Sequence, residues 1–223
     1  MITDFVADLF DAPDAQLIID RVQAMLNDEK KRRQEFYEWL QDDVKAEFIN
    51  GEVIMHSPVK RRHLRASGNL TTLLRVYVQT NNLGEVDTEK ALVALTRNDY
   101  EPDICFWRKE VADEFDDEMM KHPAPDLVVE ILSKGTTKRD RGIKFEDYAS
   151  HGVREYWLVD PMRHTVEQFR LDEEFMAFDA VGNFHLTDTI TALTVPGFTI
   201  PVRAIFEQEA NAETLRALLN QNA

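Results

Sequence analysis

Apolar residues in the first forty positions recur at the spacing of an α-helix. The segment 28–35 interrupts them and is too polar to be buried. We therefore predict a helical N-terminal extension over residues 1–43, which packs on the following domain or on a second subunit. Its apolar positions form two stripes, one made of Leu17, Ile18, Val22, Met25 and Leu26 and the other of Phe36, Trp39 and Leu40.

Strand-like runs begin at residue 46 and predict a β-hairpin over 46–55. The two runs surround Asn50-Gly51, which is the strongest short-range signal for a two-residue turn. After Pro58 we expect a helix over about 60–80, because its apolar residues follow a single helical face. That face consists of His63, Ala66, Leu70, Leu73 and Tyr77.

Short apolar runs in the rest of the chain predict further strands and two more helices. Because residues 126–159 have a strand–helix–strand pattern, we expect their two strands to be parallel and joined by a right-handed crossover. The pattern therefore predicts an α/β or α+β domain over 44–223, with a mixed sheet flanked by helices. The predicted strands cover 84–86, 91–95, 101–108, 126–132, 155–159 and 165–170, and the predicted helices cover 136–150, ended by Gly152, and 211–220, with Leu215, Leu218 and Leu219 inward.

The composition is typical of a globular protein, with 43% hydrophobic and 30% charged residues among 223. Cys105 is the single cysteine, which excludes an intrachain disulfide and a cysteine-based zinc site. The N-terminus lacks the pattern of a signal peptide, and no apolar run approaches the roughly 20 residues of a membrane span. We expect a cytoplasmic protein that does not contact a membrane.

The formal net charge of −15 argues against broad, nonspecific coating of nucleic acid. The charge is uneven, however, so a local nucleic-acid site remains compatible with it. One basic cluster spans 60–65, and a second spans 134–144. Charge alone favours the simpler interpretation that both clusters are solvated helix faces.

Two apolar strands each carry a carboxylate for which the strand has no structural need. Asp103 follows Pro102 near the start of one, and Glu130 shares a face with Val128 and Leu132 in the other. A buried carboxylate is costly unless it is paired or binds a metal, and Mg²⁺ or Mn²⁺ prefers such oxygen ligands. The alternatives are an arginine-paired Glu130 and a Pro-Asp turn at Asp103.

A lysine, a histidine and two further glutamates complete the candidate chemistry. Lys144 lies close to Phe145 and Tyr148 on the predicted helix, so partial desolvation is expected to lower its pKa; a surface lysine is the alternative. His63 on an inward stripe is more often a core histidine than a ligand. The remaining candidates are Glu47 and Glu52, which flank the hairpin turn. The simpler interpretation of both is a side chain exposed to solvent.

Over residues 44–205, the chain resembles the Uma family of predicted endonucleases, a branch of the PD-(D/E)xK nuclease superfamily. The resemblance is carried by several spaced motifs in one order. These are Glu47-Phe48-Ile49-Asn50-Gly51-Glu52-Val53, His63, Pro102-Asp103-Ile104, Pro125-Asp126-Leu127-Val128-Val129-Glu130-Ile131-Leu132-Ser133, Asp140, Lys144, Tyr148 and Glu155-Tyr156-Trp157-Leu158-Val159-Asp160-Pro161.

The resemblance implies a restriction-endonuclease-like fold, with a central mixed sheet between helices. It implies that Asp103 and Glu130, with the Ile131 carbonyl, hold Mg²⁺ or Mn²⁺. The lysine that the superfamily has two residues after the glutamate is Leu132 here, and Lys144 takes its role, orienting water or neutralising the scissile phosphate. The resemblance also allows Glu47 or Glu52 at a second metal, with His63 and Tyr148 near the site. DNA phosphates are expected to contact Lys60, Arg61, Arg62, Lys138 and Arg141.

These observations favour a metal-dependent DNA endonuclease, with Asp103, Glu130 and Lys144 as catalytic residues. A catalytically silent module that binds nucleic acid or protein on a nuclease scaffold is the alternative, since fold does not establish function. Hydrolysis of some other phosphoester is a third possibility, which the net charge of −15 slightly favours. We expect a homodimer, by analogy with nucleases that need two sites for double-strand cleavage.

Overall fold

The computed structural model describes residues 2–41, 44–88 and 90–220, with the backbone alone for residues 2–5. Two helices precede an alternation of strands and helices, so the predicted α+β class is confirmed. The helices are α1 (Ile2–Asp11), α2 (Ala15–Trp39), α3 (Arg61–Thr80), α4 (Lys109–Ala112), α5 (Thr137–Asp140), α6 (Ile143–Ser150), α7 (Arg203–Phe206) and α8 (Gln208–Asn220). The strands are β1 (Ala46–Ile49), β2 (Glu52–Met55), β3 (Gly84–Thr88), β4 (Leu92–Ala94), β5 (Asp99–Tyr100), β6 (Ile104–Arg108), β7 (Lys121–His122), β8 (Leu127–Ile131), β9 (Glu155–Asp160), β10 (Thr165–Asp172), β11 (Ala177–Phe184), β12 (Thr189–Thr191) and β13 (Thr199–Pro201).

The strands divide among three sheets, whereas we expected one central sheet. The largest has the order β11-β10-β9-β8-β6-β3, and the second has the order β2-β1-β5-β4-β7. A two-stranded ribbon of β12 and β13 completes the set. Within the largest sheet β8 and β9 are parallel, as predicted for a strand–helix–strand unit, while the other pairs are antiparallel.

Alternating side chains of β8 face two different hydrophobic cores. Leu127, Val129 and Ile131 face the core that α3, α7 and α8 cover. Val128 and Leu132 face the opposite core, between the two larger sheets and α6. The predicted alternation is therefore confirmed, and Glu130, which shares a face with Val128 and Leu132, projects to the side of the second core.

The predicted hairpin is confirmed in its turn and its register. Asn50 and Gly51 have φ angles of 51° and 81°, and Ile49 lies directly opposite Glu52. Both turn positions lie in the left-handed region, which glycine and asparagine tolerate better than other residues. The turn thereby fixes which hairpin side chains share a face.

The helix predicted over 136–150 is two helices, α5 and α6, separated at Arg141-Gly142. A side chain at Gly142 would lie 2.9 Å from the Lys138 carbonyl oxygen, so the close approach of the chain at the break needs glycine. The predicted stop at Gly152 is confirmed. This residue has a φ of 79°, and the Val153 N–H donates to the Tyr148 carbonyl, which closes the last turn.

The polar segment 28–35 is not fully solvated, contrary to our expectation. Glu29 is buried and pairs with Arg97 at 2.7 Å. Arg33 donates two hydrogen bonds of 2.6 Å to the fully buried carboxylate of Asp99. These ion pairs fix the C-terminal half of α2 on the five-stranded sheet, because a buried carboxylate needs its cation. The sequence pattern could treat these charged residues only as surface groups.

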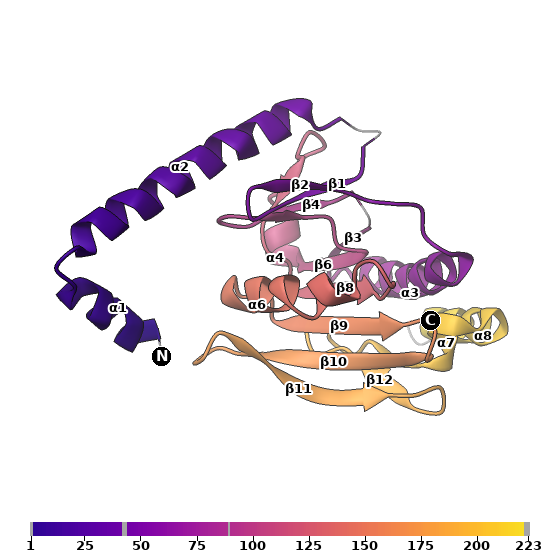
Figure 1. The fold of residues 1–223 in the computed structure, drawn as a ribbon. Coiled ribbons are helices and arrows are strands. Elements are labelled where there is room, and N and C mark those ends of the chain that lie inside the picture. Colours follow the sequence, from indigo (N-terminus) through magenta and orange to yellow (C-terminus); the bar gives the residue numbers. More distant parts are fainter. Residues whose placement is uncertain (1, 42–43, 89, 221–223) are drawn as a thin grey trace.

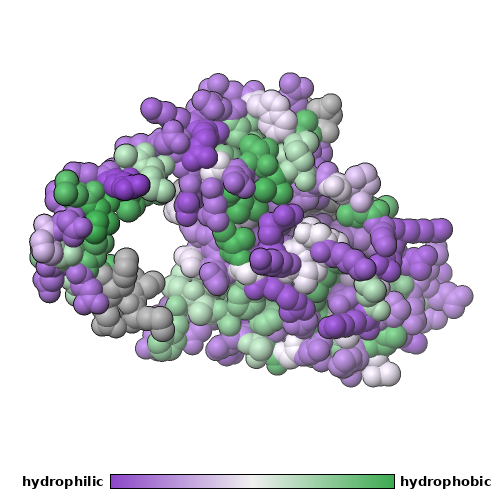
Figure 2. Space-filling view, in the orientation of Figure 1, coloured by the Kyte–Doolittle hydropathy of each residue, from purple (hydrophilic) through white to green (hydrophobic). Residues whose placement is uncertain are grey.

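The N-terminal half of α2 and the end of α1 form an arm that extends from the sheets (Figure 1). Figure 2 shows hydrophobic residues on this arm and an opening between it and the rest of the molecule. The predicted boundary after residue 43 lies outside the described residues. The arm exposes Val6, Phe10, Leu17, Ile18, Ile19, Val22 and Met25.

The C-terminal helix forms as predicted but begins earlier, at Gln208. Leu218 is buried and Leu215 packs against the first core, whereas Leu219 is 46% exposed, so its inward placement was wrong. Among the described residues, no helix is long and apolar enough to cross a bilayer.

The Arg33–Asp99 pair yields a stability prediction. We expect Arg33→Ala to lower the free energy of unfolding by about 3 kcal/mol, because it leaves a buried carboxylate without its cation. Urea denaturation of both proteins measures the difference. Arg21→Ala, at an exposed position of the same helix, is the control. Equal losses in the two variants would contradict a role for the buried pair.

Candidate active site

Glu130 lies near the C-terminal end of β8, where the sheet places it against α6. Its Oε1 accepts hydrogen bonds from Lys144 Nζ at 2.9 Å and from the Tyr148 hydroxyl at 3.2 Å. Lys144 and Tyr148 are one helical turn apart, so both reach the same carboxylate. The structure therefore brings together three of the predicted site residues.

Lys144 is 2% exposed and lies among three carboxylates. Its Nζ is 2.6 Å from Glu47 Oε1, 2.9 Å from Glu130 Oε1 and 3.9 Å from Asp140 Oδ1. Burial alone would lower the pKa of Lys144, but Glu130, Glu47 and Asp140 outweigh it and raise this pKa well above its ordinary value. Our expectation of a lowered pKa was therefore wrong, and the lysine is a buried, permanently charged group.

The hairpin contributes Glu47, which is fully buried, whereas Glu52 is exposed near the turn. Burial would raise the pKa of Glu47, but Lys144 and His56 outweigh it and lower this pKa to about 2. His56 Nε2 lies 3.3 Å from Glu47 Oε2. Of the two hairpin glutamates, only Glu47 contacts the other candidate residues.

We missed His56 and Lys45, although the hairpin register contained a signal for both. The His56 N–H donates to the Lys45 carbonyl, which continues the pairing that Asn50-Gly51 starts. Residues directly opposite or two apart in a hairpin share a face. Lys45, Glu47 and His56 could thus have been placed on one face from the turn alone.

Asp103 precedes β6 and lies beside the end of β8. Its Oδ2 accepts a 2.7 Å hydrogen bond from the Ile131 N–H and lies 3.2 Å from His63 Nε2. Lys45 Nζ is 4.0 Å from Oδ1. Burial would raise the pKa of Asp103, but these partners, His63 first, outweigh it and lower that pKa. His63 is therefore a buried histidine that contacts a predicted metal ligand.

The Ile131 carbonyl lies on the same strand edge as Asp103. Leu132 donates its N–H to Val159 of the neighbouring strand, whereas Ile131 donates to Asp103 on the other side. The N–H and C=O of one strand residue point to the same side, so the Ile131 carbonyl also points away from β9. β6 pairs with β8 only as far as Val129, which leaves this edge open.

The site holds more carboxylates than cations. Burial raises the pKa of Glu130 well above its ordinary value, and Asp140, Asp103 and Glu47 raise it further against the opposing effect of Lys144. Burial likewise raises the pKa of Asp140 to about 6 and that of Glu101 to about 7. Glu101 Oε2 is buried without a hydrogen-bond partner among the described residues. A further cation would relieve this excess of negative charge.

A cavity of about 440 Å³ opens onto these groups and is lined by Lys45, His63, Glu101, Asp103, Glu130 and Lys144. It shares residues from 56–59, and also His63, Ser133 and Thr136, with a neighbouring cavity of about 430 Å³. In the described chain, no group of three or more His, Cys, Asp or Glu side chains has the arrangement of a metal site. Sites for Mg²⁺ often use only one or two carboxylates, with water as the remaining ligands.

The neighbouring cavity gathers parts of both basic clusters. Lys60 and Arg62 line it from the start of α3, and Lys134 and Arg139 line it from the segment after β8. Three other predicted DNA contacts do not line it. Arg61 and Lys138 are exposed outside its wall, and Arg141 pairs with Glu167 at 2.8 Å. Lys134 and Arg139 belong to the second basic cluster of the sequence, but only the fold shows that these two residues line the cavity.

Comparisons with known proteins identify relatives of this chain. The model of the Uma2 family, described as "Putative restriction endonuclease", matches residues 33–203. The uncharacterised protein sll1609 of Synechocystis sp. strain PCC 6803 is 26% identical over 145 residues, which are 62% of this chain and 80% of that protein. The crystal structure of "a putative nuclease belonging to DUF820" from Anabaena variabilis ATCC 29413 superposes with a TM-score of 0.66 at 16% identity, covering 82% of this chain and 97% of that one. The likeness to this crystal structure shows a common fold.

The charge arrangement predicts a large effect of removing the buried cation. We expect Lys144→Met to reduce the free energy of unfolding by about 3 to 5 kcal/mol, because Glu47 and Glu130 lose their shared partner. Chemical denaturation in EDTA measures the loss. Lys138→Met, at an exposed position without a described partner, should change stability little. A Lys144→Met variant as stable as this control would contradict the assigned charges.

Proposed function

Since the chain belongs to the Uma2 family, we propose that it is a nuclease that hydrolyses phosphodiester bonds of DNA with the help of Mg²⁺ or Mn²⁺. The observation that carries the proposal is the meeting of Asp103, Glu130 and Lys144 at one cavity. Asp103 lies just before β6, Glu130 lies in β8 and Lys144 lies in α6, so the sheet and its crossover helix must both form before the site exists.

The donor set fits a divalent cation bound by Asp103, Glu130 and the Ile131 carbonyl. Mg²⁺ and Mn²⁺ prefer oxygen ligands, and the two carboxylates and the carbonyl are all oxygen donors. Burial, and then the negative charge of the neighbouring carboxylates, raises the pKa of Glu130, and a bound cation would offset both effects. Glu101, whose buried Oε2 has no hydrogen-bond partner in the described part of the chain, is a further candidate ligand or proton carrier at the same cavity.

A bound divalent ion would supply an activated water molecule and stabilise charge on the phosphate in the transition state. Lys144 holds Glu130 in place through its 2.9 Å contact and, from the cavity wall, would neutralise the scissile phosphate. Tyr148 donates to the same oxygen and restricts the carboxylate further. His63 and the Ile131 N–H orient Asp103. Glu47 contacts Lys144 and keeps it charged, so its effect on the reaction would pass through Lys144.

The basic cavity beside the acidic site would hold the DNA backbone. Lys60, Arg62, Lys134 and Arg139 form a local positive wall in a chain with a net charge of −15. Phosphate contacts of this kind position a strand without reading its sequence. The wall is small, which suits contact with a few phosphates near the scissile bond.

A catalytically silent module is the second candidate. The Lys144 ion pairs favour it to some extent, because Lys144 already satisfies Glu47 and one oxygen of Glu130 without a metal. The two candidates differ in whether the carboxylates bind a divalent ion.

We also propose a homodimer formed through the N-terminal arm. Leu17 and Met25 of this arm are 71% and 65% exposed. Monomeric proteins rarely expose so many apolar side chains next to one another. A dimer would bury this surface and bring two sites together for double-strand cleavage.

The metal site is tested first by calorimetry with Mg²⁺ and Mn²⁺. We expect the unmodified protein to bind the metal ion. Asp103→Asn and Glu130→Gln should lose this binding, since each substitution keeps the size of the side chain but removes its negative charge. Plasmid cleavage under the same conditions should be lost by a factor of at least 100 in both variants.

Glu174→Gln, at an exposed position of a turn, is the matched control for charge and should bind and cleave normally. Cleavage retained by Asp103→Asn or Glu130→Gln would reject the site assignment. Absence of metal binding and cleavage in the unmodified protein, with and without DNA, would favour the silent module.

Sedimentation equilibrium tests the dimer. We expect a mass twice the 25.8 kDa of the chain, and a return to the single-chain mass in the double variant Leu17→Asp, Met25→Asp. Phe175→Asp changes an apolar residue of the β10–β11 turn that is 73% exposed, and should leave the mass unchanged. A monomeric unmodified protein would contradict the proposal.

A further inference from the structure

A larger cavity, of about 580 Å³, lies at the opposite end of the central strands from the candidate active site. Phe106 and Arg108 of β6 and Arg154, just before β9, reach it. Because β6 and β8 are antiparallel, Phe106 lies beside Leu127, whereas Glu130 and Ile131 are at the other end of β8. At about 3.3 Å per residue, the ends of this strand are roughly 13 Å apart. The cavity is therefore separate from the acidic site.

The walls of this cavity combine apolar side chains with an excess of cations. Four cationic and two anionic side chains line it, in a chain whose formal net charge is −15. The cationic residues are Arg108, Lys109, Arg154 and Arg170, and the anionic residues are Glu110 and Glu173. The apolar lining consists of Leu83, Phe106, Leu171, Leu193 and Pro196.

Two of the cationic residues are already neutralised. Arg108 pairs with Asp126 at 2.6 Å and with Glu110 at 3.7 Å, and Lys109 pairs with Asp113 at 2.7 Å. These pairs fix the wall that β6 and α4 form.

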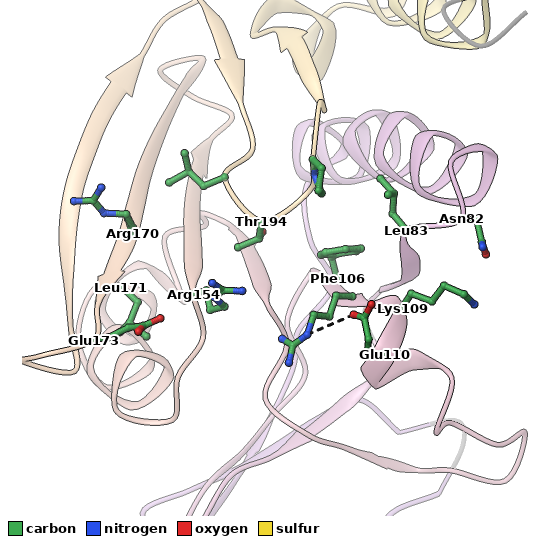
Figure 3. Close-up of a pocket in the computed structure, with 13 residues that line it drawn as sticks. Asn82, Leu83, Phe106, Lys109, Glu110, Arg154, Arg170, Leu171, Glu173 and Thr194 are labelled. Atoms are coloured by element: carbon green, nitrogen blue, oxygen red, sulfur yellow. Dashed lines mark ion pairs between the residues drawn. The ribbon is translucent and has the colours of Figure 1, made fainter.

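Arg154 and Arg170, in contrast, have no ion pair or side-chain hydrogen bond among the described residues. The Leu171 N–H donates to the Arg154 carbonyl, which fixes the Arg154 backbone beside β10. Figure 3 shows Arg154 between the strand that carries Arg170 and the wall that carries Phe106. A guanidinium without a partner beside an apolar surface is able to donate two parallel hydrogen bonds to a carboxylate or phosphate.

We propose that this cavity binds an organic anion, in which a carboxylate or phosphate is attached to a flat apolar group. Arg154 contacts the anionic group, and Arg170 adds positive charge at the rim. Leu83, Leu193 and Pro196 receive the apolar group, and the buried Phe106 supports this wall from behind. Leu193 is 48% exposed without such a partner. A volume of about 580 Å³ is in the range of sites for small ligands. Glu173, on the same wall, disfavours ligands with several negative charges.

The test is a calorimetric titration of the full chain in EDTA, which removes divalent metal from the acidic site. The probes are phenyl phosphate and benzoate, with inorganic phosphate and phenol in parallel. We expect one or both aromatic anions to bind at least tenfold more tightly than inorganic phosphate and phenol, because each of these lacks one half of the recognised chemistry. The better of the two aromatic probes identifies the anionic group.

Arginine variants locate the binding. Arg154→Gln should weaken it about tenfold and Arg170→Gln by a smaller factor, since each removes a cation from the cavity. Arg216→Gln, an exposed arginine of α8 outside the cavity, is the matched control and should bind like the unmodified protein. Equal affinity in the Arg154 and Arg216 variants, or inorganic phosphate binding as tightly as the aromatic anions, would overturn the proposal. So would the absence of binding at millimolar concentrations.

Discussion

The ammonium group of Lys144 is the charge on which the rest of the candidate site depends. It is 2% exposed and lies within 4 Å of Glu47, Glu130 and Asp140, which come from the hairpin, from β8 and from α5. An isolated carboxylate or ammonium at such depth would be strongly destabilising, and the cluster persists because all three carboxylates share the charge of Lys144. One lysine thus connects the distant hairpin with β8 and α5, which precede it closely in the chain, and any rearrangement of one segment would leave a buried charge unpaired.

The same cluster explains why neighbouring carboxylates behave differently. Glu47 contacts both Lys144 and His56, so its pKa falls to about 2. Glu130 shares the lysine but also faces Asp140 and Asp103, and burial raises its pKa. The protein therefore has one firmly ionised glutamate and one that gains from an additional cation. This asymmetry is the electrostatic basis for proposing that metal binds at Glu130 and not at Glu47.

The two ends of the central strands have opposite electrostatic character. At the end that carries Asp103 and Glu130, carboxylates outnumber cations. At the other end, Arg154 and Arg170 have no described partner. A common apolar layer, with Val128 and Tyr156 on one side of the sheet and Val129 and Trp157 on the other, separates the two ends. A sheet of this kind can support two independent sites because side chains at its two ends do not compete for partners.

The sequence by itself determined the hairpin, the alternation of β8, and the parallel pair β8 and β9, since periodicity and turn residues act locally. Its spaced motifs carried the resemblance that identified the family. It also identified Asp103, Glu130 and Lys144 as candidates. Only the tertiary structure decided that Glu47 is buried and Glu52 exposed, and that Arg141 pairs with Glu167. The tertiary structure also places Lys144 among the carboxylates that raise its pKa, and it has two larger sheets and a ribbon where one sheet was expected. The reason is physical: burial and ion pairing depend on partners brought together from distant segments, and a local pattern contains no information about which charges will share a low-dielectric environment.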